Sequence, residues 1–267
     1  MGVVYTKDGM CRQLILNWAE GMQNIRLNCL LSARVAELKG LALLQLNNHR
    51  LYGSLPLAIG NLKSLRELSL SGNLISGPIP DSICELNGLE VLDLHDNQIS
   101  APLPIGFCQG LRNLNILRLN NNTITGHIPD DIGELKNLQQ LYLGHNRMEG
   151  KLPPGLGDLS RLELLQLQHN RFVGEIPERL GQLKSLKFLF LNSNRLVGEL
   201  SGALFTGLKS LEYLLLNRNQ FHGEIPASLM GIKNIQILRL DNNYFVPPSK
   251  DKIPFGLKVG IQLGFKK

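Results

Sequence analysis

Residues 162–185 read LELLQLQHNRFVGEIPERLGQLKS, and this stretch decides the fold. Its pattern, LxxLxLxxNxLxGx[IL]PxxLGxLxx, occurs nine times along the chain at spacings of 24 or 25 residues. The nine blocks begin at Leu41, Leu65, Leu89, Leu114, Leu138, Leu162, Leu186, Leu211 and Ile235. Self-similarity at such a period is the signature of a solenoid, in which each repeat is one supersecondary unit stacked on the next.

The first half of each block predicts a short strand. In the LxxLxL segment the leucines turn inward and the residues between them face outward, because successive side chains of a strand point to opposite faces. One block cannot bury its own leucines, so the strands of successive blocks must stack in parallel, about 4.8 Å apart. Each buried leucine contributes roughly 1.5–3 kcal/mol. The sequence therefore predicts an α/β repeat with a parallel sheet.

Asparagine ends the predicted strand in eight of the nine blocks. Its side chain can pair with the backbone groups that a turn leaves open. The column consists of Asn73, Asn97, Asn122, Asn146, Asn170, Asn194, Asn219 and Asn243. His49 takes this place in the first block and predicts an imperfect terminal turn. In most blocks a glycine and a proline follow at fixed offsets, where they allow a bend and hold the preceding residue extended.

This pattern resembles the plant-type leucine-rich repeats of receptor-kinase ectodomains, receptor-like proteins and polygalacturonase inhibitors, and the resemblance covers residues 41–246. It implies a right-handed solenoid, or horseshoe, with a parallel concave sheet and with turns and short helices on the convex side. It also implies that the asparagine column is the structural ladder of that family and that partners dock on the concave face.

The two ends of the chain are expected to cap the solenoid. Residues 1–40 are predicted to form an N-terminal cap with a degenerate repeat, and residues 41–246 the nine repeats. Apolar residues of the cap recur at helical spacing, which predicts a helix over Leu14, Trp18, Met22 and Ile25. Residues 247–267 are expected to form a basic C-terminal cap strand, because apolar residues alternate with others there. The alternative is an exposed edge that pairs with a second chain.

The outward residues of the strands form the candidate binding surface. In the later blocks this surface is rich in large apolar residues, which are enriched at the centres of interfaces. In the earlier blocks it is charged, and we expect Asp96 to join that charged group. The candidate partner-binding residues are Asp93, His95, Arg118, Tyr142, Leu164, Gln166, Phe188, Phe190, Tyr213 and Leu215. The opposing interpretation is that neighbouring side chains shield these columns, which then merely tolerate apolar residues.

Residues typical of catalysis or metal binding do not form a site in the sequence. His145 and His169 share one column, but no third ligand adjoins them, so no metal is expected. Cys84 and Cys108 share a register position and are expected to be small buried thiols, with a disulfide as the alternative. No phosphate-binding loop, dinucleotide fingerprint or nucleophile elbow is present. We therefore expect neither a cofactor nor an enzyme activity.

The formal charge of +6 comes from the two ends, because residues 41–246 carry eighteen basic and eighteen acidic side chains. A neutral body does not favour a nucleic-acid partner. The N-terminus lacks a secretory pattern, which favours a cytoplasmic or membrane-peripheral location, whereas a fragment of a longer receptor would be extracellular. Gly2 fits an N-myristoylation pattern, and the lysine-rich C-terminus would supply the second signal that stable membrane attachment needs.

These observations favour a non-catalytic scaffold that binds a protein or peptide on its concave face, with a receptor-like, signalling or defence role. Two alternatives remain open. One is a secreted inhibitor of a cell-wall polysaccharide hydrolase, and the other is a structural protein that self-associates through its C-terminal strand. We expect a monomer, and membrane contact only if the chain is lipidated or part of a longer receptor.

Overall fold

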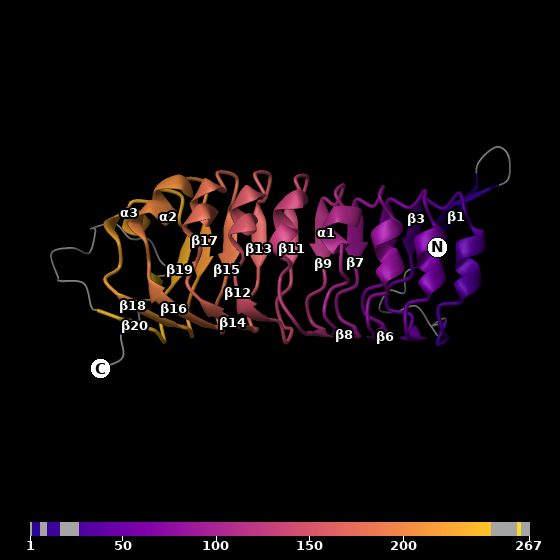
Figure 1. Ribbon diagram of the computed structural model, residues 1–267, viewed down its shortest axis with the longest axis horizontal. Coiled ribbons are helices and arrows are strands. Elements are labelled where there is room, and N and C mark those ends of the chain that lie inside the picture. The colour runs from indigo at the N-terminus through magenta and orange to yellow at the C-terminus, as the bar shows by residue number, and fades with distance from the viewer. Residues whose placement is uncertain (1, 6–9, 17–26, 247–260, 263–267) are drawn as a thin grey trace. The chain divides into compact units, whose positions relative to one another are not determined.

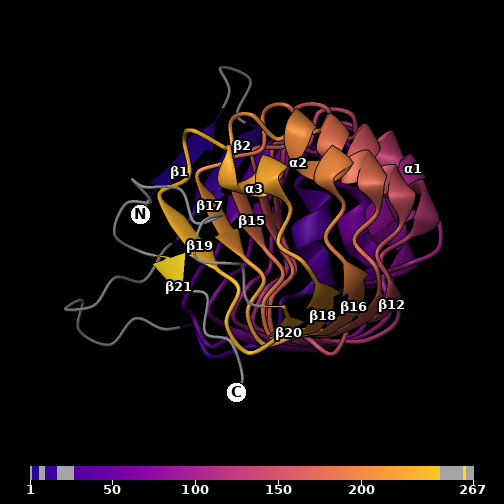
Figure 2. The same ribbon diagram turned by 90° about the vertical axis from the view of Figure 1, so that its left-hand side faces the viewer.

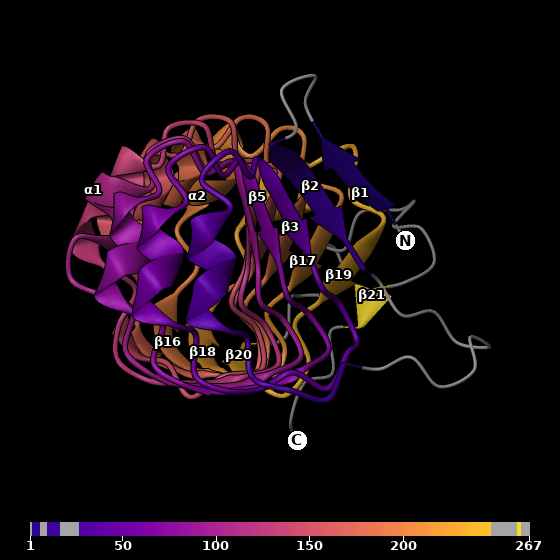
Figure 3. The same cartoon turned by 90° about the vertical axis from the view of Figure 1, so that its right-hand side faces the viewer.

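The computed structural model describes residues 2–5, 10–16, 27–246 and 261–262 (Figure 1). The chain divides into two compact units, Met1–Gly126 and His127–Lys267. In each unit every turn of the chain contributes one strand to a main sheet, then a second strand to a lateral sheet, and then a short helix. The helices lie across the unit from the main sheet (Figures 2 and 3). Each unit is therefore a leucine-rich-repeat solenoid.

The main sheet of the first unit is parallel from its second strand onward, whereas β1 and β2 form an antiparallel pair. Its strands, in order, are β1 (Gly2–Tyr5), β2 (Cys11–Ile15), β3 (Leu43–Gln45), β5 (Glu67–Ser69), β7 (Val91–Asp93) and β9 (Ile116–Arg118). The lateral sheet comprises β4 (Tyr52–Gly53), β6 (Leu74–Gly77), β8 (Gln98–Ala101) and β10 (Thr123–Ile124). The helices are η1 (Ala33–Glu37), η2 (Leu57–Asn61), η3 (Asp81–Glu85) and α1 (Phe107–Gly110).

The second unit repeats this arrangement with a main sheet in which all neighbouring strands are parallel. Its strands are β11 (Gln140–Tyr142), β13 (Leu164–Gln166), β15 (Phe188–Phe190), β17 (Tyr213–Leu215), β19 (Ile237–Arg239) and β21 (Ile261–Gln262). The lateral strands are β12 (Glu149–Lys151), β14 (Arg171–Gly174), β16 (Arg195–Glu199), β18 (Gln220–Gly223) and β20 (Tyr244–Phe245). The helices are η4 (Asp130–Glu134), η5 (Pro154–Asp158), η6 (Glu178–Gln182), α2 (Gly202–Gly207) and α3 (Ala227–Met230).

The core is a stack of leucines, as the repeat predicts. In β15 the central Leu189 is fully buried, while Phe188 and Phe190 on either side of it are half-buried and face outward. Leu165 and Leu214 are aligned with Leu189 in the neighbouring strands and are equally buried. Because each leucine is covered by its counterparts in adjacent blocks, the burial that stabilises one block depends on the next.

The asparagine column links consecutive blocks through buried hydrogen bonds. The Oδ1 atom of Asn73 accepts from the backbone N–H groups of His49 (2.9 Å) and Leu51 (3.0 Å), both in the preceding block. Its Nδ2 atom donates to the carbonyls of Leu46 (2.8 Å) and Leu70 (2.8 Å). One amide group thus satisfies turn groups of two blocks, which would otherwise be buried without partners.

The N-terminal segment differs from the sequence expectation. Leu14 lies in strand β2 and not in a helix. This strand pairs with β3 in parallel, and the Ala42 N–H donates to the Arg12 carbonyl (2.8 Å). Without β2, the first strand of the repeats would leave its backbone groups unpaired, and this requirement outweighs the helical spacing of the apolar residues. Trp18, Met22 and Ile25 lie outside the described residues.

His49 fills the first position of the ladder and bonds to the N-terminal segment. Its ring is buried, and its Nε2 atom donates to the Leu16 carbonyl (2.5 Å). At the other end, β21 pairs with β19 in parallel. The remainder of the expected cap strand, residues 247–260 and 263–267, lies outside the described residues, so its capping role remains a prediction. No helix within the described ranges has the length and apolar character needed to cross a bilayer.

We predict that Asn73→Ala destabilises the fold by roughly 3 kcal/mol, because it leaves two buried donors and two buried acceptors without partners. Urea unfolding of the full chain measures this change. The exposed Asn61, at the end of η2, provides the control, and Asn61→Ala should change the unfolding free energy by less than about 0.5 kcal/mol. Equal effects of the two substitutions would contradict the ladder's role.

Candidate binding surface

The outward side chains of β13, β15 and β17 form an aromatic and aliphatic cluster, which we call the aromatic cluster. Its members are Leu164, Phe188, Phe190, Tyr213 and Leu215. The register places Phe188 between Leu164 and Tyr213, and places Phe190 beside Leu215. The Phe188 and Tyr213 rings are 5.1 Å apart, and the Phe188 and Phe190 rings are 6.4 Å apart in an edge-to-face arrangement. All five side chains are half-buried, so the cluster keeps an exposed apolar surface.

Local sequence explains this arrangement. Each of the three strands carries a leucine at its centre, which is buried, so the residues before and after it must face outward. Parallel, in-register pairing then aligns equivalent residues of neighbouring blocks. Aromatic rings at these separations attract one another beyond the area that they bury. The cluster is thus a direct result of the repeat.

Two candidate residues lie beside the cluster and not within it. Gln166 lies next to Phe190 in the sheet, and Tyr142 is one strand further, paired with Gln166. The Tyr142 hydroxyl donates to the Oε1 atom of Gln140 in its own strand (3.2 Å). The amide of Gln166 therefore separates Tyr142 from the aromatic rings.

The first unit presents a charged cluster instead, as the sequence predicts. His95 donates from Nδ1 to Oδ1 of Asp93 (2.5 Å), and its Nε2 lies 3.5 Å from Oδ2 of Asp96. Arg118, in the next strand, lies 3.5 Å from the second oxygen of Asp93. Asp93 is 7% exposed, so its charge is compensated by both the imidazole and the guanidinium. These contacts fix the side chains in one arrangement.

The hydrogen bond to Asp93 raises the pKa of His95 above its ordinary value; burial opposes this shift, and the charges of Asp93 and Asp96 support it. A raised pKa in the folded state means that the charged pair stabilises the fold fully below the ordinary histidine pKa. That contribution is lost as the pH rises through the raised pKa. The charged pair in this cluster is therefore lost at a pH above the ordinary histidine pKa.

His145 and His169 stack, with ring centroids 4.2 Å apart. Burial lowers the pKa of His169, and the nearby charges of His145 and Arg218 lower it further. Across the described residues, no group of three or more His, Cys, Asp or Glu side chains is placed to hold a metal ion. Both histidines directly precede a ladder asparagine, in the turn that follows the main strand.

Cys84 and Cys108 both remain thiols; Cys108 is buried and Cys84 is half-buried. The Sγ atom of Cys84 donates to the Ile105 carbonyl (3.8 Å). Burial raises the pKa of the Cys84 thiol, and the charge of Asp81 raises it further. Both effects disfavour the thiolate, which is the reactive form.

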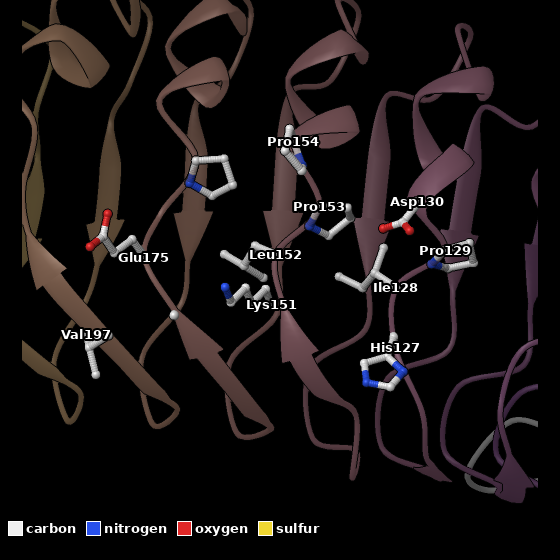
Figure 4. Close-up of a pocket in the computed structure, with 12 residues that line it drawn as sticks. His127, Ile128, Pro129, Asp130, Lys151, Leu152, Pro153, Pro154, Glu175 and Val197 are labelled. Atoms are coloured by element: carbon white, nitrogen blue, oxygen red, sulfur yellow. The ribbon is translucent and has the colours of Figure 1, made fainter.

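A groove on the second unit was not predicted from the sequence. It lies between the lateral strands and the helical turns and has a volume of about 1010 Å³ (Figure 4). Its lining residues are His127, Ile128, Pro129, Asp130, Lys151, Leu152, Pro153, Pro154, Gly174, Glu175, Pro177 and Val197. Most of them, all except Gly174 and Val197, come from equivalent positions of successive blocks. An alignment of the blocks by column is therefore the sequence signal that could have located the groove. Its mixed charges do not converge on one point (Figure 4).

The chain also matches known families and structures. The leucine-rich repeat region family matches residues 22–149, and the leucine rich repeat family matches residues 161–183 and 210–232. A comparison with curated proteins finds no match. Together with the two-sheet solenoid and its asparagine ladder, these matches show that the chain belongs to the leucine-rich-repeat proteins.

Several solved structures are similar. The plant peptide hormone receptor RGFR1, solved in complex with RGF2, is 32% identical with a TM-score of 0.81 over 88% of this chain and 36% of its own. The Arabidopsis receptor kinase HAESA ectodomain, with an IDA peptide hormone, is 33% identical with a TM-score of 0.79 over 88% and 38%. A plant ice-binding protein is 28% identical with a TM-score of 0.78 over 94% and 79%. The chain thus spans little more than a third of these two receptor chains.

We predict that Asp93→Asn lowers the pKa of His95 toward its ordinary value or below it, because the substitution removes the charged acceptor while burial remains. Titration of the His95 ring signals by nuclear magnetic resonance measures this change. Asp96→Asn serves as the control, since its carboxylate is 3.5 Å from the ring and makes the smaller contribution. A titration curve that Asp93→Asn leaves unchanged would show that this pair does not form in solution.

Proposed function

We propose that this chain is a non-catalytic recognition module of a receptor-like protein, and that it binds a peptide or protein ligand through the aromatic cluster of its second unit. One observation carries the proposal. Three consecutive strands present five large apolar side chains outward, although the repeat requires only their central leucines to be apolar. Partly exposed, clustered aromatic side chains are enriched at the centres of protein interfaces.

The chemistry of the cluster suits a protein or peptide ligand. Phe188, Phe190 and Tyr213 offer rigid rings that lose little conformational freedom on binding, which is why aromatic residues dominate the energetics of interfaces. The Tyr213 hydroxyl bonds to Oε1 of Gln236 (3.2 Å), so a polar group adjoins the apolar surface at its edge. This combination of apolar centre and polar rim is typical of protein recognition.

The charged cluster of Asp93, His95 and Arg118 belongs to the first unit and does not carry the proposal, because charges that are already paired gain little from a ligand. Likeness to receptors solved with peptide hormones supports a peptide or protein ligand and a role in signalling. The match covers only about a third of those receptor chains. The similarity therefore supports ligand recognition by this chain, and a receptor activity is our proposal.

We predict that Phe188→Ala combined with Tyr213→Ala weakens ligand binding by at least about tenfold, which corresponds to about 1.4 kcal/mol, without unfolding the chain. Ligands are captured from the native source with the immobilised wild-type chain, and their affinities are then compared by calorimetry. The matched control is Leu57→Ala combined with Ile105→Ala, which truncates two exposed apolar side chains (74% and 98% exposed) outside the main sheet.

We expect the captured ligand to bind the Leu57 and Ile105 variant as it binds the wild type, and to bind the Phe188 and Tyr213 variant more weakly. Equal affinity of the wild type and the Phe188 and Tyr213 variant would refute it. Circular dichroism confirms that both variants keep the fold, so a loss of affinity is not mistaken for unfolding.

A further inference from the structure

A column of arginines follows the main strands of the second unit. Arg147, Arg171 and Arg195 occupy the tenth position of three consecutive blocks, and Arg218 occupies the eighth position of the next block. All four side chains are exposed. They lie where the chain turns from the main sheet to the lateral sheet, and Arg171 and Arg195 are the first residues of β14 and β16. We call this surface the arginine ridge.

These arginines are available to a ligand. Among the ion pairs that the described residues form, none includes a ridge arginine, whereas Arg179 on the helical side is paired with Asp158. Two acidic residues of the lateral strands do not form ion pairs with the ridge in the described structure. Glu149 is the register partner of Arg171 without forming an ion pair in the described structure, and Glu199 faces His222 (3.9 Å).

The repeat does not require arginine at these positions. In the first unit the tenth positions hold Arg50, Leu74, Gln98 and Thr123, and the eighth positions hold Asn48, Gly72, Asp96 and Asn121. The turn closes there through the same asparagine bonds. Since leucine, glutamine and threonine are tolerated at the tenth position, the accumulation of arginine in one unit is not explained by folding.

Apolar side chains alternate with the arginines. On β14, Arg171 and Val173 both face outward, and on β16 so do Arg195 and Val197, since residues two apart in a strand share a face. The register pairs Val173 directly with Arg195. Both valines are exposed (38% and 36%). The lateral sheet therefore presents an interleaved pattern of cationic and apolar groups.

We propose that the arginine ridge, with Val173 and Val197, binds an acidic segment of a partner protein in an extended conformation. Carboxylates match the planar fork of arginine, which binds them with two parallel hydrogen bonds. An extended peptide that alternates acidic and apolar side chains would place both kinds of group on this surface. A uniformly charged polysaccharide or nucleic acid would leave the valines uncovered. The site is separate from the aromatic cluster, whose side chains come from the main strands.

The test uses the full chain and a fluorescein-labelled peptide of six Glu-Val repeats, with binding followed by fluorescence anisotropy at low and raised salt. We expect Arg171→Glu combined with Arg195→Glu to weaken binding by about tenfold or more, because it reverses two charges at the centre of the ridge. The matched control is Lys184→Glu combined with Lys209→Glu. These exposed lysines precede β15 and β17, at the opposite end of the strands, and give the same change in net charge.

We expect the control to bind the peptide as the wild type does. We also expect Val173→Ser combined with Val197→Ser, which keeps every charge, to weaken binding about threefold. Equal losses in both charge-reversal variants, or no binding by the wild type, would overturn the proposal. It would also be overturned if heparin or a single-stranded oligothymidylate bound through the arginines more tightly than the peptide and with no effect of the serine substitutions. That result would assign the ridge to a uniform polyanion.

Discussion

The hydrogen bonds of the asparagine column are the constraint on which the rest of the structure depends. A ladder asparagine such as Asn170 bonds to backbone groups of its own turn, at Leu167 (3.2 Å), and of the preceding block, at Met148 (3.0 Å). These bonds end the strand at a fixed residue, so the leucines before them stack in register. Because the inward leucines and asparagines hold the blocks together, the repeat pattern itself leaves the outward residues unspecified.

Because inward residues stabilise the fold and outward residues form the surface, different surfaces occur on one scaffold. The residue on either side of each inward leucine belongs to the main-sheet face, and in the second unit these residues form the aromatic cluster. The residues next to the asparagine lie where the chain leaves the main sheet and form the arginine ridge: Arg147, Arg171 and Arg195 follow a ladder asparagine, and Arg218 precedes one. On the main-sheet face of the first unit, the residues beside the inward leucines include the charged group of Asp93, His95 and Arg118 instead. Specificity is thus set by columns of side chains that recur at the period of the repeat.

Most of the fold could be predicted from the sequence, because a period of 24 residues determines both the strand positions and their register. The neighbours of Phe188 follow from the same alignment, since in-register stacking leaves no choice of partner. The strand at Leu14 could not be predicted, because its pairing with β3 depends on an edge that no local pattern reveals. The arginine ridge was not predicted for another reason. The repeats are neutral in total, and the excess of positive charge becomes visible only when the blocks are aligned and the position of Arg171 and Arg195 is compared between them.

The central claim is that the outward columns of the second unit contact the ligand, whereas the exposed apolar residues on the helical side of the first unit do not. It is tested most directly by placing a photo-crosslinking amino acid at Phe190 in one sample and at the exposed Leu57 or Ile105 in others, and irradiating each in the presence of captured ligand. The account predicts a covalent adduct from position 190 and none from positions 57 and 105. Adducts from position 57 or 105 without one from position 190 would contradict it.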